Sequence, residues 1–258
     1  MIDPGTLALL ALAGLLAGFI DAVVGGGGLV QLPALLLGMP GATPLQVLAT
    51  NKLGSICGTS VSAATYARRL RPDPRTFVPL MVCAFAGSLA GAVTARLITE
   101  DVFAPVVLVA LIAVGAWTVL RPAAGQVTEI RLGQRGHLVA AIALGLGIGF
   151  YDGVLGPGTG SFLVIGLVGL VGYSFLEASA SAKLANWATN LAALVVFVPM
   201  GAVVWKVGLV IGAANVLGGY LGARTAIGRG PGFVRGFFLV VVAVFVVRIG
   251  GEVLGLWG

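Results

Sequence analysis

Apolar residues run along this chain in eight long segments that are separated by shorter polar stretches. The segments occupy residues 6–40, 44–67, 77–98, 102–120, 138–172, 175–199, 202–223 and 233–254. Crossing the hydrocarbon core of a bilayer takes roughly 20 apolar residues of α-helix, and several segments reach that length. A membrane-spanning β-barrel would show short stretches of alternating hydrophobicity, whereas these apolar runs are continuous. The pattern predicts an all-α polytopic membrane protein.

The two halves of the chain repeat each other at an offset of 131 residues, as Gly149 against Gly18 illustrates. Many identities share this register: Gly18-Phe19/Gly149-Phe150, Asp21/Asp152, Gly25/Gly156, Gly27/Gly158, Gly38/Gly169, Lys52-Leu53/Lys183-Leu184, Gly87/Gly218, Gly91/Gly222 and Ala92/Ala223. We therefore expect a first repeat at 1–120, a cytoplasmic linker at 121–136 and a second repeat at 137–258. A duplicated membrane protein with charges at matching positions indicates a transporter whose site lies between the repeats.

The first apolar segment of each half is too long for one simple crossing and is interrupted near its middle. Four glycines at 25–28 interrupt one, and Gly-Pro-Gly-Thr-Gly at 156–160 interrupts the other. Glycine costs a helix about 1 kcal/mol and proline about 3 kcal/mol, so the helix should break there. Non-helical backbone at membrane depth is tolerated where it lines an enclosed cavity. This favours a re-entrant, V-shaped element in each half, with a full hairpin as the alternative.

Small residues spaced four apart recur at the repeat offset. They form the pairs Gly14/Gly18, Gly145/Gly149, Gly87/Gly91 and Gly218/Gly222. Such pairs let two helices approach closely in a membrane. We therefore expect these glycines at helix–helix interfaces.

Composition supports the membrane assignment. The chain is 59% hydrophobic and 9% charged, with mean hydropathy +1.08, whereas a soluble domain carries about 25% charged residues. The net charge of +6 does not indicate nucleic-acid binding, because the arginines lie between apolar runs. Membrane topology and anionic lipid headgroups account for them there.

The basic stretches Arg68–Arg75, Arg121–Arg135 and Arg224–Arg235 predict the topology. They share one side of the membrane only if the broken first segment of each half makes an even number of crossings. Each half then has an odd number of crossings, so the two repeats are inverted relative to each other. The positive-inside rule assigns the basic loops to the cytoplasm, which leaves both termini outside.

Lys52 and Lys183 occupy matching positions inside apolar segments. A lysine at membrane depth costs at least about 2.5 kcal/mol on insertion scales. Helical spacing places further polar side chains beside them: Ser55 and Thr59 beside Lys52, and Asn186, Trp187 and Asn190 beside Lys183. A cation next to neutral donors suits an anion with several oxygens, so these residues are candidates for substrate binding. Alternatively, each lysine neutralises a buried aspartate or extends to the membrane interface.

Asp21 and Asp152 are the matching acids, each four residues before its glycine run. They could pair with Lys52 or Lys183, within or across the halves. They could also take up a proton and couple transport to the proton gradient. A third role is to cap a helix near the break.

The glycine runs are themselves candidates for substrate binding. A helix that begins after such a run points free N–H groups and a positive dipole end towards the break. Gly27, Gly28, Gly158 and Thr159 lie at these positions. The alternative is that glycine only permits a tight bend, and both roles are compatible.

Enzyme and metal chemistry find little support. Cys57 and Cys83 both lie inside apolar segments, where free thiols behave as small apolar residues. The single histidine, His137, sits at the edge of a basic loop, where solvation is the expected state. No nucleophile–base pairing or metal-ligand cluster suggests itself. We therefore expect no enzymatic activity, no metal and no cofactor.

At these residues the chain resembles the TauE/SafE family of sulfite and organosulfonate permeases. The resemblance covers nearly the whole chain and depends on a set of motifs: residues 18–21 with the glycines at 25–28 and Pro33, Ala49-Thr50-Asn51-Lys52, residues 149–153 with 156–160, and Ala182-Lys183-Leu184-Ala185-Asn186. It implies a bacterial inner-membrane transporter of sulfite, sulfonates or related small anions. Ser55 stands where the second half has Asn186, so the two half-sites are not equivalent.

Together these features predict a secondary transporter that exports a small sulfur-containing anion by alternating access between inverted repeats. Its partners would be the anion and membrane lipid, and the pattern leaves an oligomer open. A passive anion channel would use the same residues without coupling. A non-transporting membrane scaffold or assembly factor is the third hypothesis, against which the short loops argue.

Overall fold

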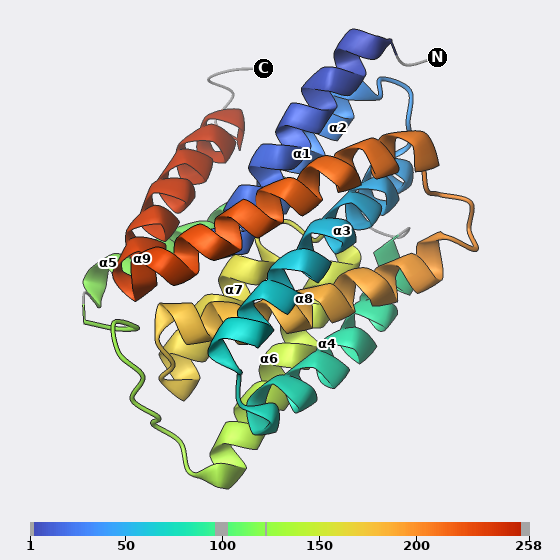
Figure 1. Cartoon of the computed structure of the whole chain (residues 1–258). Helices are drawn as coiled ribbons and strands as arrows, with labels where there is room; N and C mark the ends of the chain where they lie inside the picture. The colour runs from blue at the N-terminus through green and yellow to red at the C-terminus, as the bar shows by residue number, and fades with distance from the viewer. Residues whose placement is uncertain (1–2, 96–102, 122, 254–258) are drawn as a thin grey trace.

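Helices make up every regular element in the described part of the chain (Figure 1). The computed structural model describes residues 3–95, 103–121 and 123–253. The first half contains α1 (Pro4–Val24), α2 (Gly27–Gly38), α3 (Pro44–Leu70), α4 (Pro74–Thr94) and α5 (Phe103–Leu120). The second contains α6 (Gln134–Val154), α7 (Thr159–Gly166), the π-helical η3 (Leu167–Val171), α8 (Phe175–Phe197) and α9 (Trp205–Val253). The predicted all-α class is confirmed for these residues.

Several helices could cross a bilayer by length and composition. α1, α4, α6 and the long α9 each contain a window apolar enough to do so. α8 has a more polar sequence that includes Lys183, and it is buried along most of its length. The apolar helices can therefore face lipid while the polar side chains of α8 are enclosed by protein.

α9 corrects one expectation from the sequence. The segments 202–223 and 233–254 were expected to be separate, with the basic stretch 224–235 as a loop between them. The structure has two separate helices, as expected, but they meet directly at a kink at Gly230, where φ is 78° and ψ is −175°, and no loop lies between them. Pro231 follows and cannot continue the backbone hydrogen bonding of the preceding turn. The basic residues therefore lie at a bend, visible in Figure 1 where α9 reverses direction.

Local sequence explains where several helices begin. The side chains of Asp3, Thr43 and Asp73 each accept a hydrogen bond from a backbone N–H of the first turn, and a proline follows each of them. An oxygen-bearing cap satisfies free helix donors, and proline at the first helical position lacks the donor that would be free. Gln46 completes a capping box with Thr43. Ser174 caps α8 in the same way.

The two halves interlock instead of packing as separate bodies. α1 packs chiefly on α9, and α6 packs chiefly on α4. α3 contacts α9 and α8, while α8 contacts α4 and α3. Figure 1 shows α3 and α8 between the α1–α9 and α4–α6 pairs. The first helix of each half is thus held by the other half.

Close approach at these interfaces depends on the repeated glycines. A Cβ added at Gly18 would lie 2.6 Å from the carbonyl oxygen of Asn215, and one at Gly149 would lie 2.4 Å from that of Ala84. The two contacts match at the repeat offset with the halves exchanged, since 84 and 215 also differ by 131. Side chains larger than hydrogen would force the helices apart at both places. The predicted small-residue pairs therefore lie at helix interfaces.

Candidate functional site

Both long first segments break at their glycine runs. α1 ends at Val24 and α2 begins at Gly27, with Gly25 in the left-handed region at φ 84°. In the second half α6 ends at Val154 and α7 begins at Thr159. Gly156 and Gly158 both have positive φ there, at 94° and 80°. Glycine adopts these angles without the steric penalty of a side chain.

The two breaks touch each other. The Ser161 N–H donates to the Gly25 carbonyl at 3.3 Å, and the Ser161 hydroxyl donates to the Val24 carbonyl at 2.9 Å. A Cβ on Gly25 would lie 2.2 Å from the carbonyl carbon of Gly160. The carbonyls at the end of α1, which no further helical turn can satisfy, are thereby bonded by the other half.

Two ion pairs flank this meeting point, and each joins one half to the other. The Lys52 ammonium lies 2.6 Å from Asp152 Oδ2, and the Lys183 ammonium lies 2.8 Å from Asp21 Oδ2. The sequence left open whether the lysines pair with the aspartates, and whether within or across the halves. In the structure each lysine pairs with the aspartate of the other half. Because pairing leaves no isolated charge in the protein interior, it also explains how two lysines are accommodated at membrane depth.

The two ion pairs are not equivalent. Lys52 and Asp152 are enclosed, with side chains 1% and 2% exposed, and Lys52 also donates to the Asp152 backbone carbonyl at 2.7 Å. Lys183 is 0% exposed, but its partner Asp21 is 15% exposed, and the Lys183 ammonium donates to Asp21 Oδ2 at 2.8 Å. The Lys52–Asp152 pair is thus the more enclosed of the two, and the aspartate of the Lys183–Asp21 pair is the more exposed.

A small polar cavity of about 20 Å³ lies between the breaks. Both halves line it: Asp21, Gly25, Gly28, Asn51, Lys52 and Ser55 from the first, and Asp152, Gly156, Gly158, Thr159, Gly160, Asn186 and Asn190 from the second. A volume of this size holds about one water molecule. Most of the residues selected from the sequence thus converge at one place.

Three selected residues lie outside the cavity lining. The Thr59 hydroxyl donates to carbonyls of its own helix, at Ser55 and Ile56. Gly27 packs against Ala17 and Asp21. Lys183 faces Asp21, so it reaches the cavity only through that carboxylate.

Four lining residues were absent from the candidate site residues chosen from the sequence: Gly25, Asn51, Gly156 and Gly160. The glycines were recognised as helix breakers. Gly25 and Gly156 have positive φ, and Gly160 packs directly against Gly25. Asn51 escaped selection because Ala182 is its counterpart in the second half. The sequence could have indicated Asn51 as a site residue, because it directly precedes Lys52.

A buried polar network supports the first half of the site. The Asn215 amide donates to Gln31 Oε1 at 2.6 Å, and the Gln31 amide donates to the Asn51 backbone carbonyl at 3.1 Å. The matching positions in the other half are the apolar Phe162 and Ala84. The repeats therefore share their charged pairs but differ in the polar groups behind them.

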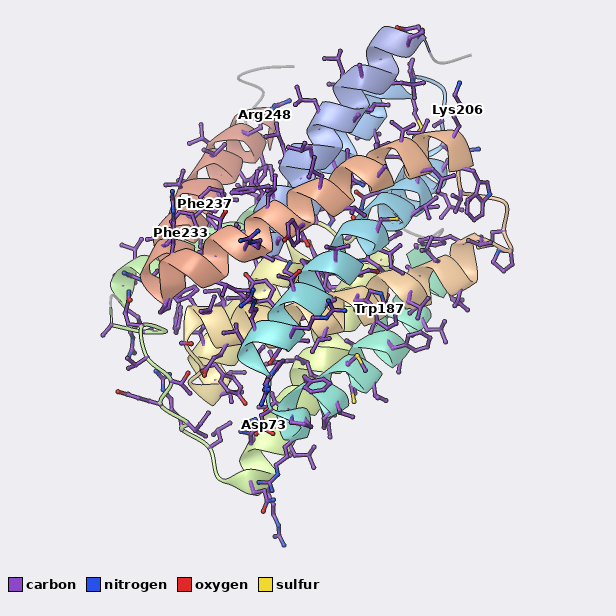
Figure 2. All side chains as sticks on the ribbon, in the orientation of Figure 1. Asp73, Trp187, Lys206, Phe233, Phe237 and Arg248 are labelled. Carbon is purple, nitrogen blue, oxygen red and sulfur yellow. The ribbon has the colours of Figure 1, made fainter. Side chains whose placement is uncertain are left out.

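Two other polar residues considered from the sequence have structural contacts away from the cavity. The Trp187 indole N–H donates to the Ser60 hydroxyl at 3.0 Å, between α8 and α3 (Figure 2). His137 hydrogen-bonds the Thr76 hydroxyl, which in turn contacts the Tyr173 hydroxyl at 2.7 Å. Neither side chain lines the cavity, and His137 has protein partners where solvation was expected.

Comparison with known proteins gives a consistent match over nearly the whole chain. A family profile described as sulfite exporter TauE/SafE matches residues 10–249. A probable membrane transporter protein, ORF9, of Sinorhizobium sp is 37% identical over 243 residues, covering 94% of this chain and 92% of the relative. The probable membrane transporter protein YfcA of Escherichia coli (strain K12) is 35% identical over 250 residues, covering 96% and 91%. No solved structure gives a significant match.

Proposed function

Because this chain belongs to the sulfite exporter TauE/SafE family and is a membrane transporter, not an enzyme, we propose that it exports a small sulfur-containing anion. Sulfite and organosulfonates are the proposed substrates, and the inner membrane of a bacterial cell is the proposed location. Two lysines that enter cross-half ion pairs at the meeting of two broken helices carry this proposal. Buried ammonium groups beside neutral hydrogen-bonding side chains suit an oxyanion.

We expect some of the candidate residues to bind the anion directly and others to hold the surrounding backbone in place. Lys52 would attract the anion, with Ser55, Asn186 and Asn190 bonding its oxygens from the cavity wall. Gly28, Gly158 and Thr159 would bring backbone N–H groups at the starts of α2 and α7 close to it. Lys183 would act when its bond to Asp21 opens, while Thr59 and Gly27 hold the surrounding backbone.

The small cavity favours alternating access over an open pore. A space for about one water is too small for a sulfonate, so the two breaks must separate to admit substrate. Since both ion pairs and the Ser161–Gly25 contact join the halves, rocking of one half against the other would open and re-form them. This movement is the one expected between inverted repeats.

The reciprocal contacts between the halves support the inverted arrangement that we propose. α1–α9 and α6–α4 are equivalent pairs with the halves exchanged, as an internal two-fold relation requires. In the proposed topology the broken segments are re-entrant, the basic stretches face the cytoplasm and the termini lie outside. Figure 1 shows the start of α1 and the end of α9 towards the same end of the molecule.

Asp21 is the proposed coupling residue if transport uses the proton gradient. Its carboxylate is the partly exposed member of its ion pair and lines the cavity. Binding a proton would remove a negative charge from the path of the anion and free Lys183. Asp152 bonds Lys52 through both its backbone carbonyl and its carboxylate and is only 2% exposed, so it is less accessible to a proton than Asp21.

Flux of sulfite and sulfoacetate into proteoliposomes, with and without an imposed proton gradient, tests the proposal. We expect saturable flux in the wild type and its loss in Lys52→Ala and Lys183→Ala. Lys206→Ala is the matched control, because Lys206 is exposed at the start of α9. Flux retained in both site variants would contradict the assigned role of the lysines. Transport that never proceeds against a gradient would indicate a passive anion channel.

A further inference from the structure

Asn51 lines the cavity and carries a buried hydrogen-bond acceptor that lacks a donor. Asn51 is 3% exposed and lines the cavity. Among the residues that the structure describes, no group donates a hydrogen bond to its buried Oδ1 atom. Buried polar atoms in folded proteins are nearly always bonded, so an acceptor of this kind beside a binding cavity indicates where the donor of an occupant belongs.

The neighbours of Asn51 provide the complementary half of a binding site. Ser55 lies one helical turn further along α3, on the same face, and also lines the cavity. The Lys52 ammonium has three N–H groups and bonds the carbonyl and Oδ2 of Asp152 at 2.7 and 2.6 Å. One N–H therefore remains for an anionic oxygen in the cavity that Asn51 also lines.

The unpaired Asn51 Oδ1 acceptor has no counterpart in the second half. The position that corresponds to Asn51 in the second half is Ala182, whose side chain cannot hydrogen-bond. Two equivalent half-sites would accept a small anion in either orientation. With the acceptor on one side only, an occupant that satisfies it has a single preferred orientation.

Building on the proposed function, we propose that the transported sulfonate carries its own hydrogen-bond donor, a hydroxyl or amino group near the sulfonate. Its negative oxygens face Lys52 and Ser55, and its donor bonds Asn51 Oδ1 once the halves have parted to admit it. A site built to bond a substrate hydroxyl discriminates strongly against the analogue that lacks it, because a buried group is then left unpaired.

Isethionate and ethanesulfonate form the decisive substrate pair, since they share the sulfonate and the two-carbon chain and differ in one hydroxyl. Initial rates into proteoliposomes give kcat/KM for each. We expect the wild type to prefer isethionate by about ten-fold or more, and Asn51→Ala to lose this preference through slower isethionate transport. Lys206→Ala is the control, because Lys206 is exposed at the start of α9 and lies outside the cavity lining. It should keep the preference.

The outcomes separate this inference from the function on which it depends. Equal transport of the two sulfonates by the wild type would overturn the inference and leave sulfonate transport standing. This wild-type ratio decides the matter even where Asn51→Ala is not recovered as a folded protein. A preference that persists in folded Asn51→Ala would also overturn it. No flux of either sulfonate, or of sulfite, would overturn the proposed function itself.

Discussion

The two lysine–aspartate pairs differ in how far water can stabilise the aspartate when its lysine is absent. Asp152 is 2% exposed, whereas Asp21 is 15% exposed beside the cavity. A buried ion pair contributes little net stability compared with an apolar pair of similar size, but removing one partner leaves a costly isolated charge. The same substitution should therefore have different consequences at the two lysines.

Lys52→Met should lower the free energy of unfolding by about 3–5 kcal/mol, because it leaves the Asp152 carboxylate buried without a cation. The double variant Lys52→Met/Asp152→Leu should recover much of this loss. Lys183→Met should destabilise less, since the Asp21 side chain is 15% exposed, against 2% for Asp152. Thermal unfolding in detergent measures all three, and a double variant no more stable than the single one would contradict the argument.

Asp21→Asn should uncouple transport from the proton gradient. The amide keeps the size of the side chain but cannot release or bind the proton, so the imposed gradient should no longer accelerate sulfite flux. Downhill flux should continue, because the cavity loses a negative charge. Asp152→Asn is the comparison and should retain any acceleration that the wild type shows. Proteoliposome flux at matched anion gradients tests this, and an unchanged response in Asp21→Asn would exclude the residue as the coupling group.

At the scale of elements, glycine has two separate tasks. At Gly25 it permits a left-handed backbone and direct contact with Gly160 at the crossing of the breaks. Along α1 and α6 it lets helices from opposite halves approach to backbone contact. Elsewhere in the same helices a glycine has neither task, which provides an internal comparison.

Gly149→Ala and Gly147→Ala in α6 form that comparison. A Cβ at Gly149 would meet the Ala84 carbonyl oxygen at 2.4 Å, whereas one at Gly147 would meet nothing within 4 Å. We expect Gly149→Ala to destabilise the protein by about 1–3 kcal/mol through overpacking. Gly147→Ala should stabilise it by about 0.5–1 kcal/mol, because alanine favours a helix more than glycine does. Unfolding temperatures check both signs, and equal shifts would show that α4–α6 packing does not depend on the glycine.

At the scale of the whole molecule, the charges should set the orientation in the membrane. Figure 2 places Asp73, which lies within the basic stretch 68–75, at one end of the molecule and Lys206 at the other. The proposed topology puts these ends in the cytoplasm and outside, respectively. The bend of α9 that carries Arg229 should share the side of Asp73.

Single cysteines in a background without Cys57 and Cys83 test this orientation. An impermeant maleimide should label Lys206→Cys on intact cells. It should label Arg71→Cys and Arg229→Cys only after the membrane is made permeable, because the positive-inside rule keeps both stretches in the cytoplasm. Labelling of Arg71→Cys and Arg229→Cys from opposite sides would refute the inverted arrangement.

The sequence by itself determined that this is a helical membrane protein, where its first segments break, and which charged residues match between the halves. These properties follow from composition, helix propensity and spacing along one stretch of chain, so they do not depend on what each stretch contacts. The basic stretch 224–235 was misjudged because a single glycine–proline bend can join two helices without a loop.

Only the tertiary structure decided which lysine meets which aspartate, and that both pairs join opposite halves. It also decided that Thr59 bonds its own helix while Asn51, with no polar counterpart at Ala182, lines the cavity. The reason is physical: an ion pair or a cavity depends on distances between segments about a hundred residues apart. Those distances are set by how α1 and α6 pack into the opposite half, which no local pattern encodes.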